Sequence, residues 1–474
     1  MAPLLLLTRP LQSDFYRLMT DYLSGSHAAI LDTSVKNGQG ASFSYAFPFE
    51  PYAIITARRR QCALTLNGVT ERFDSDPLEL LDTYLKKWKM DIENPPAPFF
   101  GGALTVFGYE LRHLFEKLKP DGLRKDRFPD LYASFYDAIV ICDHSAGTVS
   151  LCVTDPVGLG KTHLGKRFDE CRIMFEKILD KQTSETGSNV CRFTAGYPVS
   201  NFTIDSYCRA VHDVLYHIRN GDIYQANLSQ AFEFEFSGEP LALYEKLREA
   251  SPSVFGAFVR MGGRTLISSS PERFVKKCGS KVITSPIKGT RPRGSTPEED
   301  RRLAVELMNS AKDRAELSMI VDLERNDLGR VAVAGSVVVK ENPVLNSHAN
   351  VHHLSANIEA ELKEGKTAID IIRATFPGGS ITGAPKIRAM DIISRLEPTS
   401  RSLYTGSLGW ICFNGDMDSN LLIRSITIEE SAGRFQVGGG IVADSNPDAE
   451  YQETLDKARG ILKALGCKEG DIYG

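Results

Sequence analysis

The sequence contains no run of about 18 apolar residues, the length that a membrane-spanning helix requires. Its amino terminus, MAPLLLLTRP, has four consecutive leucines but no basic segment before them, and the apolar stretch is too short for a signal peptide. The formal net charge is only −4, so no general attraction to nucleic acid or to an anionic membrane is expected. The sequence therefore predicts a protein that binds neither nucleic acid nor a membrane.

Cysteine occurs nine times, but no two cysteines form a C-x-x-C pair, and an odd number cannot pair completely. This pattern indicates free thiols in a reducing compartment, so we expect a cytoplasmic location. No cysteine lies in a Gly-x-Cys-x-Gly segment, which argues against a fused glutaminase nucleophile. There is no H-E-x-x-H motif, and the adjacent His352 and His353 lack cysteine or histidine partners at zinc spacing. A zinc site is therefore not expected.

Two glycine-rich segments match nucleotide-binding loops only in part. Gly160-Lys161-Thr162 resembles the end of a phosphate-binding loop, but the pattern requires glycine five positions before Gly160, where Asp155 stands. The run from Gly438 to Gly440 lacks the third spaced glycine of a dinucleotide fingerprint, and no acidic ribose partner follows. Neither segment predicts a nucleotide site.

A chain of 474 residues is too long for one ordinary core, so one composite domain or two domains are expected. The stretch 181–201 is rich in Ser, Thr, Gly and Asn and predicts a boundary between an N-terminal domain, 1–195, and a second domain, 202–467. The first part has helical periodicity at 78–88 and 166–179 and several strand-like runs, at 52–56, 102–106, 138–142 and 149–154.

The second part has clearer signals. Thr203 begins a helix that Gly221 ends, and Thr296-Pro-Glu-Glu299 is a capping box with proline at the first helical position. A last helix is expected from Asn446-Pro447 to Gly466. The phenylalanines of 232–236 alternate with glutamates, as in a half-buried strand. Since strands and helices mix without a βαβ rhythm, an α+β fold with large antiparallel sheets is expected.

Two segments carry residues suited to proton transfer or nucleophilic attack. Glu272 follows the small residues of 268–270, and burial would let it protonate a departing hydroxyl; a turn residue paired with Arg273 is the alternative. Lys288 lies between a proline-led strand and a glycine turn. A desolvated lysine there can lose its proton and attack, whereas a solvated surface lysine is the alternative. Spacing alone leaves both alternatives open.

Acidic residues also recur at a spacing of three. Asp313 and Glu316 are one such pair, for which a helix capping box is the alternative. Glu450 and Glu453 fall on one flank of the last predicted helix, with Lys457 one turn after Glu453. Two carboxylates from different helices would suit Mg²⁺, which prefers oxygen ligands and retains several waters. An exposed Glu–Lys pair is the alternative.

Taken together, the ordered segments resemble the chorismate-binding family, which includes anthranilate, aminodeoxychorismate, isochorismate and salicylate synthases. The resemblance runs from about residue 202 to residue 465 through eight motifs: SSSPERF, SPIKGT, KDRAELSMIVDLERNDLGR, VHHLSA, GGSITGAPK, LYTGSLGW, GGGIVADS and YQETLDKAR. It implies an α+β fold in which two large antiparallel sheets pack as a β-sandwich with helices outside, as in anthranilate synthase component I. The N-terminal part would complete the sandwich.

The same resemblance implies roles for individual residues. Glu316 and Glu453 match magnesium ligands, with Glu450 close by, and the metal would hold the carboxylate on the ring of chorismate. Arg424 and Tyr404 match residues that bind the enolpyruvyl carboxylate, a task that suits an arginine fork.

Further positions match residues around the substrate. His353 and Glu272 match residues near the leaving hydroxyl. Ser380 stands where many members have threonine, and Thr382 where they have serine, so both hydroxyls are kept. Glycines allow a carboxylate to approach the backbone closely, and the remaining expected substrate-binding residues are Gly438, Gly439, Gly440 and Lys457.

Two positions distinguish the reactions of this family. Gln225 stands where isochorismate and salicylate synthases have a lysine that activates water, so attack by water is not expected. Lys288 stands where anthranilate synthases have alanine, and it resembles the members that form 4-amino-4-deoxychorismate, the precursor of p-aminobenzoate and folate. In those members the lysine attacks ring carbon 2 and ammonia then adds at carbon 4. Anthranilate synthase component I is the nearest alternative.

The resemblance also bears on partners. Because no glutaminase is expected in the chain, ammonia would come from a separate glutamine amidotransferase subunit. The chain ends directly after the last predicted helix, so we expect the lyase that makes p-aminobenzoate to be a separate enzyme. Relatives often carry a tryptophan pocket near a Leu-Leu-x-Ser segment, but the comparable stretch reads Ile30-Leu31-Asp32-Thr33, which leaves tryptophan binding open. Intact catalytic positions argue against a non-catalytic chorismate-binding protein.

Overall fold

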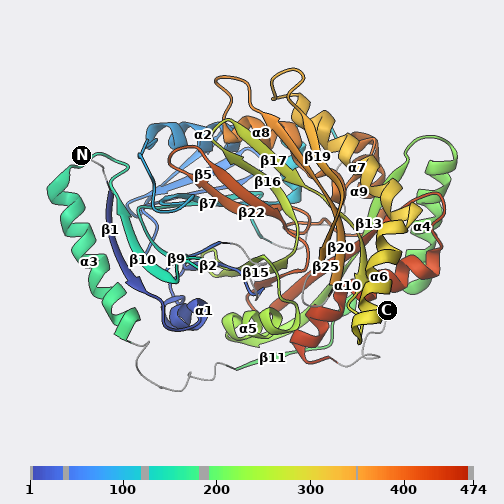
Figure 1. Ribbon diagram of the computed structural model, residues 1–474, viewed down its shortest axis with the longest axis horizontal. Coiled ribbons are helices and arrows are strands. Elements are labelled where there is room, and N and C mark those ends of the chain that lie inside the picture. Colours follow the sequence, from blue (N-terminus) through green and yellow to red (C-terminus); the bar gives the residue numbers. More distant parts are fainter. Residues whose placement is uncertain (1–3, 36–41, 119–126, 181–191, 348–350, 468–474) are drawn as a thin grey trace.

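Two large antiparallel sheets dominate the computed structural model, which describes residues 4–35, 42–118, 127–180, 192–347 and 351–467 (Figure 1). Over these residues the first sheet has 13 strands. In spatial order they are β1 (Leu4–Pro10), β10 (Thr148–Thr154), β9 (Ala138–Asp143), β3 (Phe43–Phe47), β2 (Ala29–Asp32), β14 (Phe255–Arg260), β15 (Arg264–Ser270), β24 (Ser425–Glu429), β25 (Ala432–Ile441), β13 (Gln225–Gly238) and β11 (Phe193–Ala195), with β12 (Val199–Ser200) and β21 (Gly383–Ala384) also paired to β13.

The second sheet has 12 strands within the same ranges. Their order is β18 (Ile287–Pro292), β20 (Val351–Glu361), β17 (Lys281–Ser285), β16 (Arg273–Cys278), β23 (Met417–Leu421), β22 (Ser407–Cys412), β7 (Gly102–Phe107), β8 (Leu131–Tyr136), β4 (Ala53–Arg58), β5 (Gln61–Leu66) and β6 (Val69–Asp74), with β19 (Val338–Ser347) beside β20. The predicted α+β fold with two large antiparallel sheets is confirmed.

Aromatic side chains join the facing surfaces of the two sheets. Phe47 on β3 lies 4.7 Å from Tyr136 on β8, measured between ring centroids. Tyr45 on β3 lies 6.2 Å from Trp410 on β22, and Phe99 contacts both of these rings. Burial of these large side chains supplies much of the apolar area that stabilises the sandwich.

Helices cover the outer faces (Figure 1). The 13-stranded sheet packs against α3, α5 and α10, through buried side chains such as Phe175, Leu243 and Ile461. Helix α1 lies on the same side, next to α3, and the remaining helices lie against the second sheet or at the end of the sandwich where β13 runs. The helices are α1 (Phe15–Met19), α2 (Pro77–Lys87), α3 (Lys161–Asp180), α4 (Ile204–Arg219), α5 (Pro240–Ala250), α6 (Pro297–Asn309), α7 (Ala311–Gly329), α8 (Ala368–Thr375), α9 (Lys386–Leu396) and α10 (Pro447–Leu465).

Both sheets draw strands from both parts of the chain. In the first sheet β2 pairs with β14, and in the second sheet β7 pairs with β22. Residues 181–191 of the expected linker lie outside the described residues. Its remainder is not a free linker, because β11 and β12 pair with β13. The division into 1–195 and 202–467 stays a prediction.

Several local predictions are confirmed by capping geometry. Thr203 caps α4, and the side chain of Asn446 caps α10, which ends at Gly466 in the left-handed conformation that glycine favours. Phe232, Phe234 and Phe236 are buried on β13 as expected.

Two predicted boundaries are wrong in part. At α6 the side chain of Thr296 accepts from the amide of Glu299, but the Glu299 carboxylate accepts from Ser295, so the capping box is only half formed. Helix α3 begins five residues before the predicted start at 166, because the Asp155 carboxylate accepts from the amides of Gly158, Leu159 and Gly160 before it. These amides, which a phosphate-binding loop would offer to a phosphate, are used by the Asp155 carboxylate.

No helix among the described residues is long and apolar enough to cross a membrane. All cysteines in these residues are free, in agreement with the expected absence of disulfides. Burial raises the pKa of the thiols of Cys142, Cys171 and Cys412 to about 12. These three thiols are therefore poor nucleophiles at neutral pH.

The aromatic contacts between the sheets predict a large effect of Phe47→Ala. The ring is fully buried against Tyr136 and Phe99, so truncation should lower the free energy of unfolding by about 3–5 kcal/mol. Urea unfolding measures this loss. The control is Phe73→Ala on β6, where the side chain is 37% exposed and a change within about 0.5 kcal/mol is expected. Equal effects of the two substitutions would contradict this packing arrangement.

Candidate active site

Lys288 is directed into the site by an irregularity in its strand. The pairing of β18 with β20 shifts between Lys288 and Thr290, and Gly289 between them has a φ of +78°. A side chain at Gly289 would also meet Asp313 of α7 at 3.0 Å, so glycine is required by both conformation and space. A bulge of this kind re-aims the neighbouring side chain.

Glu272, Lys288 and Ser380 form one hydrogen-bonded group. Lys288 Nζ donates to the backbone oxygen of Ser380 at 3.0 Å, and Ser380 Oγ donates to Glu272 Oε1 at 2.7 Å. The backbone amide of Ile287 also donates to Glu272 Oε1 at 3.2 Å. Both of these bonds to Glu272 end at Oε1, so Oε2 takes no part in them.

Burial shifts both titratable groups toward their neutral forms. Burial raises the pKa of Glu272, although Ser380 and Lys288 act in the opposite direction. Burial lowers the pKa of Lys288, and the charge of Lys457 adds to that effect, while Glu316 and Glu272 oppose it. A neutral carboxylic acid can donate a proton and a neutral amine can attack carbon, so the two shifts suit acid catalysis beside a nucleophile.

His353 lies on β20, directly opposite Thr290 of β18. Its ring is buried, and its Nδ1 is 2.9 Å from Thr290 Oγ1. The neighbouring residue on β20, Leu354, pairs with Lys288. The structure thus places His353 one strand away from the nucleophile candidate, on the same local stretch of sheet.

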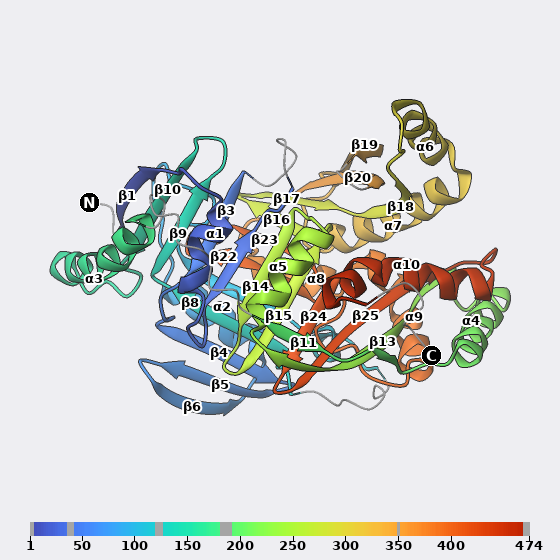
Figure 2. The same cartoon turned by 90° about the horizontal axis from the view of Figure 1, so that it is seen from below.

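The acidic residues of α10 face the glycines of β25, and the two elements run side by side (Figure 2). A side chain added at Gly439 would lie 3.3 Å from Glu450 Oε2 and 3.5 Å from Glu453 Oε1, so the glycine backbone lies directly against both carboxylates. Lys457 Nζ bonds Glu453 Oε1 at 2.7 Å and donates to the backbone oxygen of Gly438 at 3.0 Å. Burial raises the pKa of Glu453, but Lys457, Lys312 and Lys288 together hold that pKa below its usual value.

Glu450 has one oxygen available. Ser445 donates to Glu450 Oε1 at 2.6 Å, whereas Oε2 is buried without a hydrogen-bond partner. Burial raises the pKa of this carboxyl, and the charge of Glu453 adds to the effect. An orphaned carboxylate oxygen is costly unless a cation or a donor arrives to satisfy it.

Glu316 of α7 completes the acidic side of the site. Burial raises the pKa of Glu316 above its usual value, and the charge of Glu453 adds to this effect. The charges of Lys288 and Lys312 act in the opposite direction. In the part of the chain that the structure describes, no three His, Cys, Asp or Glu residues form a ready-made metal cluster. The carboxylates of Glu316, Glu450 and Glu453 nevertheless fit Mg²⁺, because that ion takes one or two carboxylates and completes its shell with water and substrate oxygens.

Arg424 is a cation without an anion. Burial lowers the pKa of its guanidinium, and no described residue forms a hydrogen bond or ion pair with that side chain. The backbone of Arg424 is in the left-handed region, with a φ of +50°, and its carbonyl accepts from Ser269 beside the Glu272 turn. A half-buried guanidinium on a left-handed backbone, without a partner among the described residues, suits a site that binds an anionic ligand.

Tyr404 is connected to the Arg424 segment through the backbone. Thr405 donates its amide to Leu422, two residues before Arg424. Burial raises the pKa of Tyr404, so its hydroxyl stays protonated and can donate to a carboxylate.

Gln225 lies close to Lys288. An added side chain at Gly440 would meet Gln225 Nε2 at 2.3 Å and Lys288 Nζ at 3.7 Å, so the amide and the amine flank the same glycine. Both polar atoms of the Gln225 side chain are buried without a hydrogen-bond partner in the described residues. A primary amide does not act as a base, but it can accept from or donate to a small nucleophile.

A buried ion pair behind the site was not found from the sequence. Arg401 bonds both oxygens of Glu397 at 2.9 and 2.8 Å. Its guanidinium also donates to the backbone oxygens of Ile381 and Asn227. Both charged residues are almost completely buried. The sequence signal for this pair is a spacing of four residues between Glu397 and Arg401. That spacing indicates a side-chain pair only within a helix, and no helix was predicted there.

Lys386 is a second residue whose role was missed. Its Nζ is 2.5 Å from Asp327 Oδ2 and donates to the backbone oxygens of Thr375 and Pro377. It therefore ties the turn before Ser380 to α7, the helix that carries Glu316.

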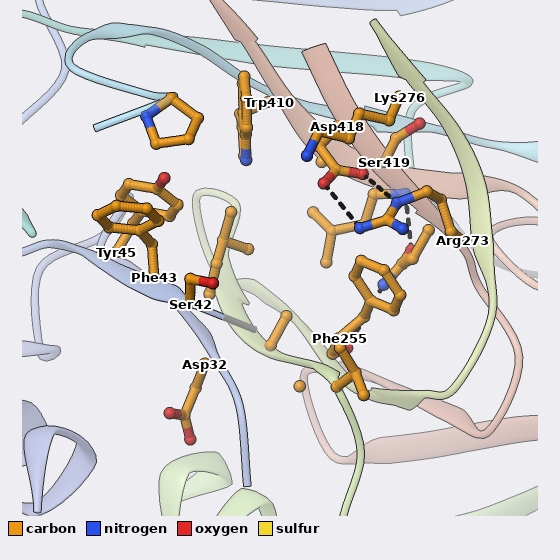
Figure 3. Close-up of a pocket in the computed structure, with 18 residues that line it drawn as sticks. Asp32, Ser42, Phe43, Tyr45, Phe255, Arg273, Lys276, Trp410, Asp418 and Ser419 are labelled. Atoms are coloured by element: carbon orange, nitrogen blue, oxygen red, sulfur yellow. Dashed lines mark hydrogen bonds and ion pairs between the residues drawn. The ribbon is translucent and has the colours of Figure 1, made fainter. Parts of the chain in front are cut away.

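A separate cavity of about 460 Å³ lies between the two sheets (Figure 3). Tyr45, Trp410 and Phe255 form its aromatic walls, and the ion pair of Arg273 with Asp418 lies on one side. The segment compared above with the tryptophan pocket of relatives borders this cavity through Leu31 and Asp32. Because Arg273 forms its ion pair with Asp418, it is not the partner of Glu272. The alternative in which Glu272 is only a turn residue paired with Arg273 is therefore wrong.

Comparisons with known proteins agree with this geometry. The chain is 41% identical to "Aminodeoxychorismate synthase component 1" of Escherichia coli (strain K12), over 88% of each chain. It is 36% identical to "Anthranilate synthase component 1" of Thermus thermophilus, over 97% of each chain. The crystal structure of anthranilate synthase component I from Streptococcus pneumoniae superposes with a TM-score of 0.77 at 30% identity, covering 90% of this chain and 93% of that one.

The sequence profile of the family described as chorismate binding enzyme matches residues 33–463. This range contains every residue of the site described above, from Gln225 to Lys457. The chain belongs to the chorismate binding enzyme family.

Proposed function

We propose that the chain converts chorismate and ammonia to 4-amino-4-deoxychorismate, as the synthase subunit of a two-component enzyme. The observation that carries this proposal is Lys288, half-buried and bonded to Ser380 beside the buried acid Glu272. The name of the Escherichia coli relative, "Aminodeoxychorismate synthase component 1", supports it. Gln225 takes no proton from water, so the site favours a nitrogen nucleophile over water.

Chorismate carries two carboxylates, and the site offers two places for them. The unpaired guanidinium of Arg424, with the hydroxyl of Tyr404, binds the enolpyruvyl carboxylate through charge-assisted hydrogen bonds. The ring carboxylate lies toward the acidic side, next to the bare backbone of Gly438–Gly440. This orientation brings the carbon atoms of the ring between Lys288 and Glu272.

Mg²⁺ would be held by Glu316 and Glu453, with Glu450 close by. When bound, the ion neutralises the ring carboxylate and polarises the ring to which that carboxylate is attached. Lys457 keeps Glu453 ionised and so keeps it able to bind a cation.

The chain's own residues then perform two displacements. The neutral amine of Lys288 forms a bond to ring carbon 2 while Glu272 gives its proton to the 4-hydroxyl, which leaves as water. Ammonia next forms a bond to carbon 4, and Lys288 leaves carbon 2 as the neutral amine. The new ammonium group returns a proton to Glu272, so the acid and the nucleophile are both restored.

Ammonia would be delivered by a separate glutamine amidotransferase subunit. The names of relatives as component 1 support a second component. The described cysteines are mostly buried, in agreement with a chain that has no glutaminase nucleophile of its own.

Lys288→Ala tests the choice of reaction. It removes the nucleophile, so product formation from ammonium should fall by orders of magnitude while chorismate still binds through Arg424 and Tyr404. Lys288→Arg should fail almost as badly, because guanidinium stays protonated. Lys281→Ala is the control, since that lysine is 55% exposed on β17, the strand that precedes β18 in the chain.

Product is identified by mass, and a covalent adduct on Lys288 should accumulate in wild-type protein when ammonia is withheld. Similar rates of 4-amino-4-deoxychorismate formation by wild type and Lys288→Ala would show that the lysine is not the nucleophile. Anthranilate as the product of the wild type would assign the alternative reaction.

Glu453→Ala tests the acidic side. It should abolish turnover at ordinary magnesium concentrations and leave the circular dichroism spectrum and the melting temperature nearly unchanged, because the residue is partly exposed at the site. Asp456→Asn, one turn away with a 49% exposed side chain, is the control. Activity of Glu453→Ala equal to the control across a magnesium titration would rule out this ligand assignment.

Nitrogen supply gives a third test. The purified chain should form product with an ammonium salt in alkaline buffer, where part of the ammonium is free ammonia. Glutamine should not replace it, because no cysteine of the sequence lies in a Gly-x-Cys-x-Gly segment that would supply a glutaminase nucleophile. Glutamine-dependent product from the chain alone would contradict the need for a second subunit.

A further inference from the structure

Glu324 is a buried acid that the proposed reaction does not use. It lies on α7, eight positions after Glu316, with 9% of its surface exposed. It lines a small cavity together with Thr284 of β17 and the backbone at Gly378 and Gly379. A side chain added at Gly379 would lie 3.5 Å from Glu324 Cγ, so the glutamate packs directly behind the turn that carries Ser380.

The hydrogen bonds of Thr284 fix the protonation state of this acid. Thr284 Oγ lies 2.8 Å from the backbone oxygen of Phe274 and 2.7 Å from Glu324 Oε2. A hydroxyl has one hydrogen, and a backbone carbonyl can only accept. The Thr284 hydroxyl therefore donates its hydrogen to the backbone oxygen of Phe274. The second bond then needs a hydrogen from the carboxyl group of Glu324, which donates to Thr284.

The surrounding charges agree with a neutral acid. Two carboxylates act on it, Glu272 from the turn after β15 and Asp327 from α7, and the cation that acts against them is Lys386 of α9. Lys386 is already paired with Asp327. Burial raises the pKa of Glu324 to about 8, and the charges of Glu272 and Asp327 add to that effect.

We propose that Glu324 is a positioning residue that remains protonated, donates a hydrogen bond to Thr284, and thereby holds the Ser380 turn against Glu272 and Lys288. Thr284 precedes the segment that leads to Lys288, and Ser380 bonds both Lys288 and Glu272. The neutral form holds these elements together without adding a negative charge behind the catalytic acid. The effect on turnover rests on the proposed function, whereas the protonation state does not.

The pH dependence of stability has a definite sign. An unfolded glutamate titrates at a pKa of about 4.3, and the folded pKa lies near 8. Between these values the folded protein holds a proton that the unfolded chain has lost, so Glu324 reduces stability progressively as pH rises from about 4.3 to 8. Glu324→Gln keeps a donor for Thr284 and cannot titrate, so its melting temperature relative to wild type should increase across that window.

Infrared spectroscopy measures the proton directly. The difference spectrum of wild type minus Glu324→Gln at pH 7 should contain the C=O stretch of a protonated carboxyl group, and the band should disappear as pH rises past about 8. Asp322→Asn is the control, because that carboxylate on the same helix is 73% exposed and paired with Arg325. It should give no such band and no pH-dependent gain in melting temperature.

Turnover measures the positioning role. Glu324→Gln should keep kcat within about threefold of wild type, whereas Glu324→Ala should lower kcat by about tenfold or more with little change in KM for chorismate. An absent acid band together with a Glu324→Gln variant less stable than wild type at pH 7 would overturn the protonated state. A present band with full kcat in Glu324→Ala would overturn the positioning role. If wild type makes no 4-amino-4-deoxychorismate at all, the proposed function fails, and the infrared and melting data still decide the protonation of Glu324.

Discussion

The arrangement of the site depends on the buried ion pair between Arg401 and Glu397. Two opposite charges removed from water are tolerated only when their hydrogen-bonding capacity is met, and here it is met by backbone groups of the site itself. The guanidinium of Arg401 donates hydrogen bonds to the backbone oxygens of Asn227 and Ile381. The carboxylate of Glu397 accepts from the amide and the hydroxyl of Ser229. The pair therefore fixes β13, the turn before β21 and the loop of Tyr404 in one relative position.

Around this framework, the site balances charge through burial. Cations such as Lys288 and acids such as Glu272 each lose part of their preference for the charged form, so proton transfer between them and a substrate becomes less costly. Arg424 is the exception, since guanidinium cannot give up its proton. Its unpaired charge is stabilised only when an anion enters, which links binding of a carboxylate to completion of the electrostatics of the site.

Much of the fold could be predicted because its signals are local. The limits of α10 follow from Asn446 and Gly466, and the strand around Phe234 follows from strict alternation. The site depended instead on ordered motifs, since neither Glu272 nor Lys288 could be assigned from spacing alone. The Arg401 network could not be predicted, because its partners lie up to 174 residues away and are mostly backbone atoms that leave no mark in sequence. The strands in the expected linker were missed for a similar reason. Both β11 and β12 are strands because they pair with β13, which lies later in the chain.

The interleaving of the two sheets has a consequence for synthesis of the chain. Strand β7 has its partner β22 about 300 residues later, with Gly102 opposite Cys412. At about 5–20 residues per second, translation leaves such a strand without that neighbour for roughly 15–60 s. During this time β7 presents an unpaired apolar edge on the ribosome. An unpaired edge of this kind can pair with strands of other chains, so the long interval favours aggregation of the nascent chain.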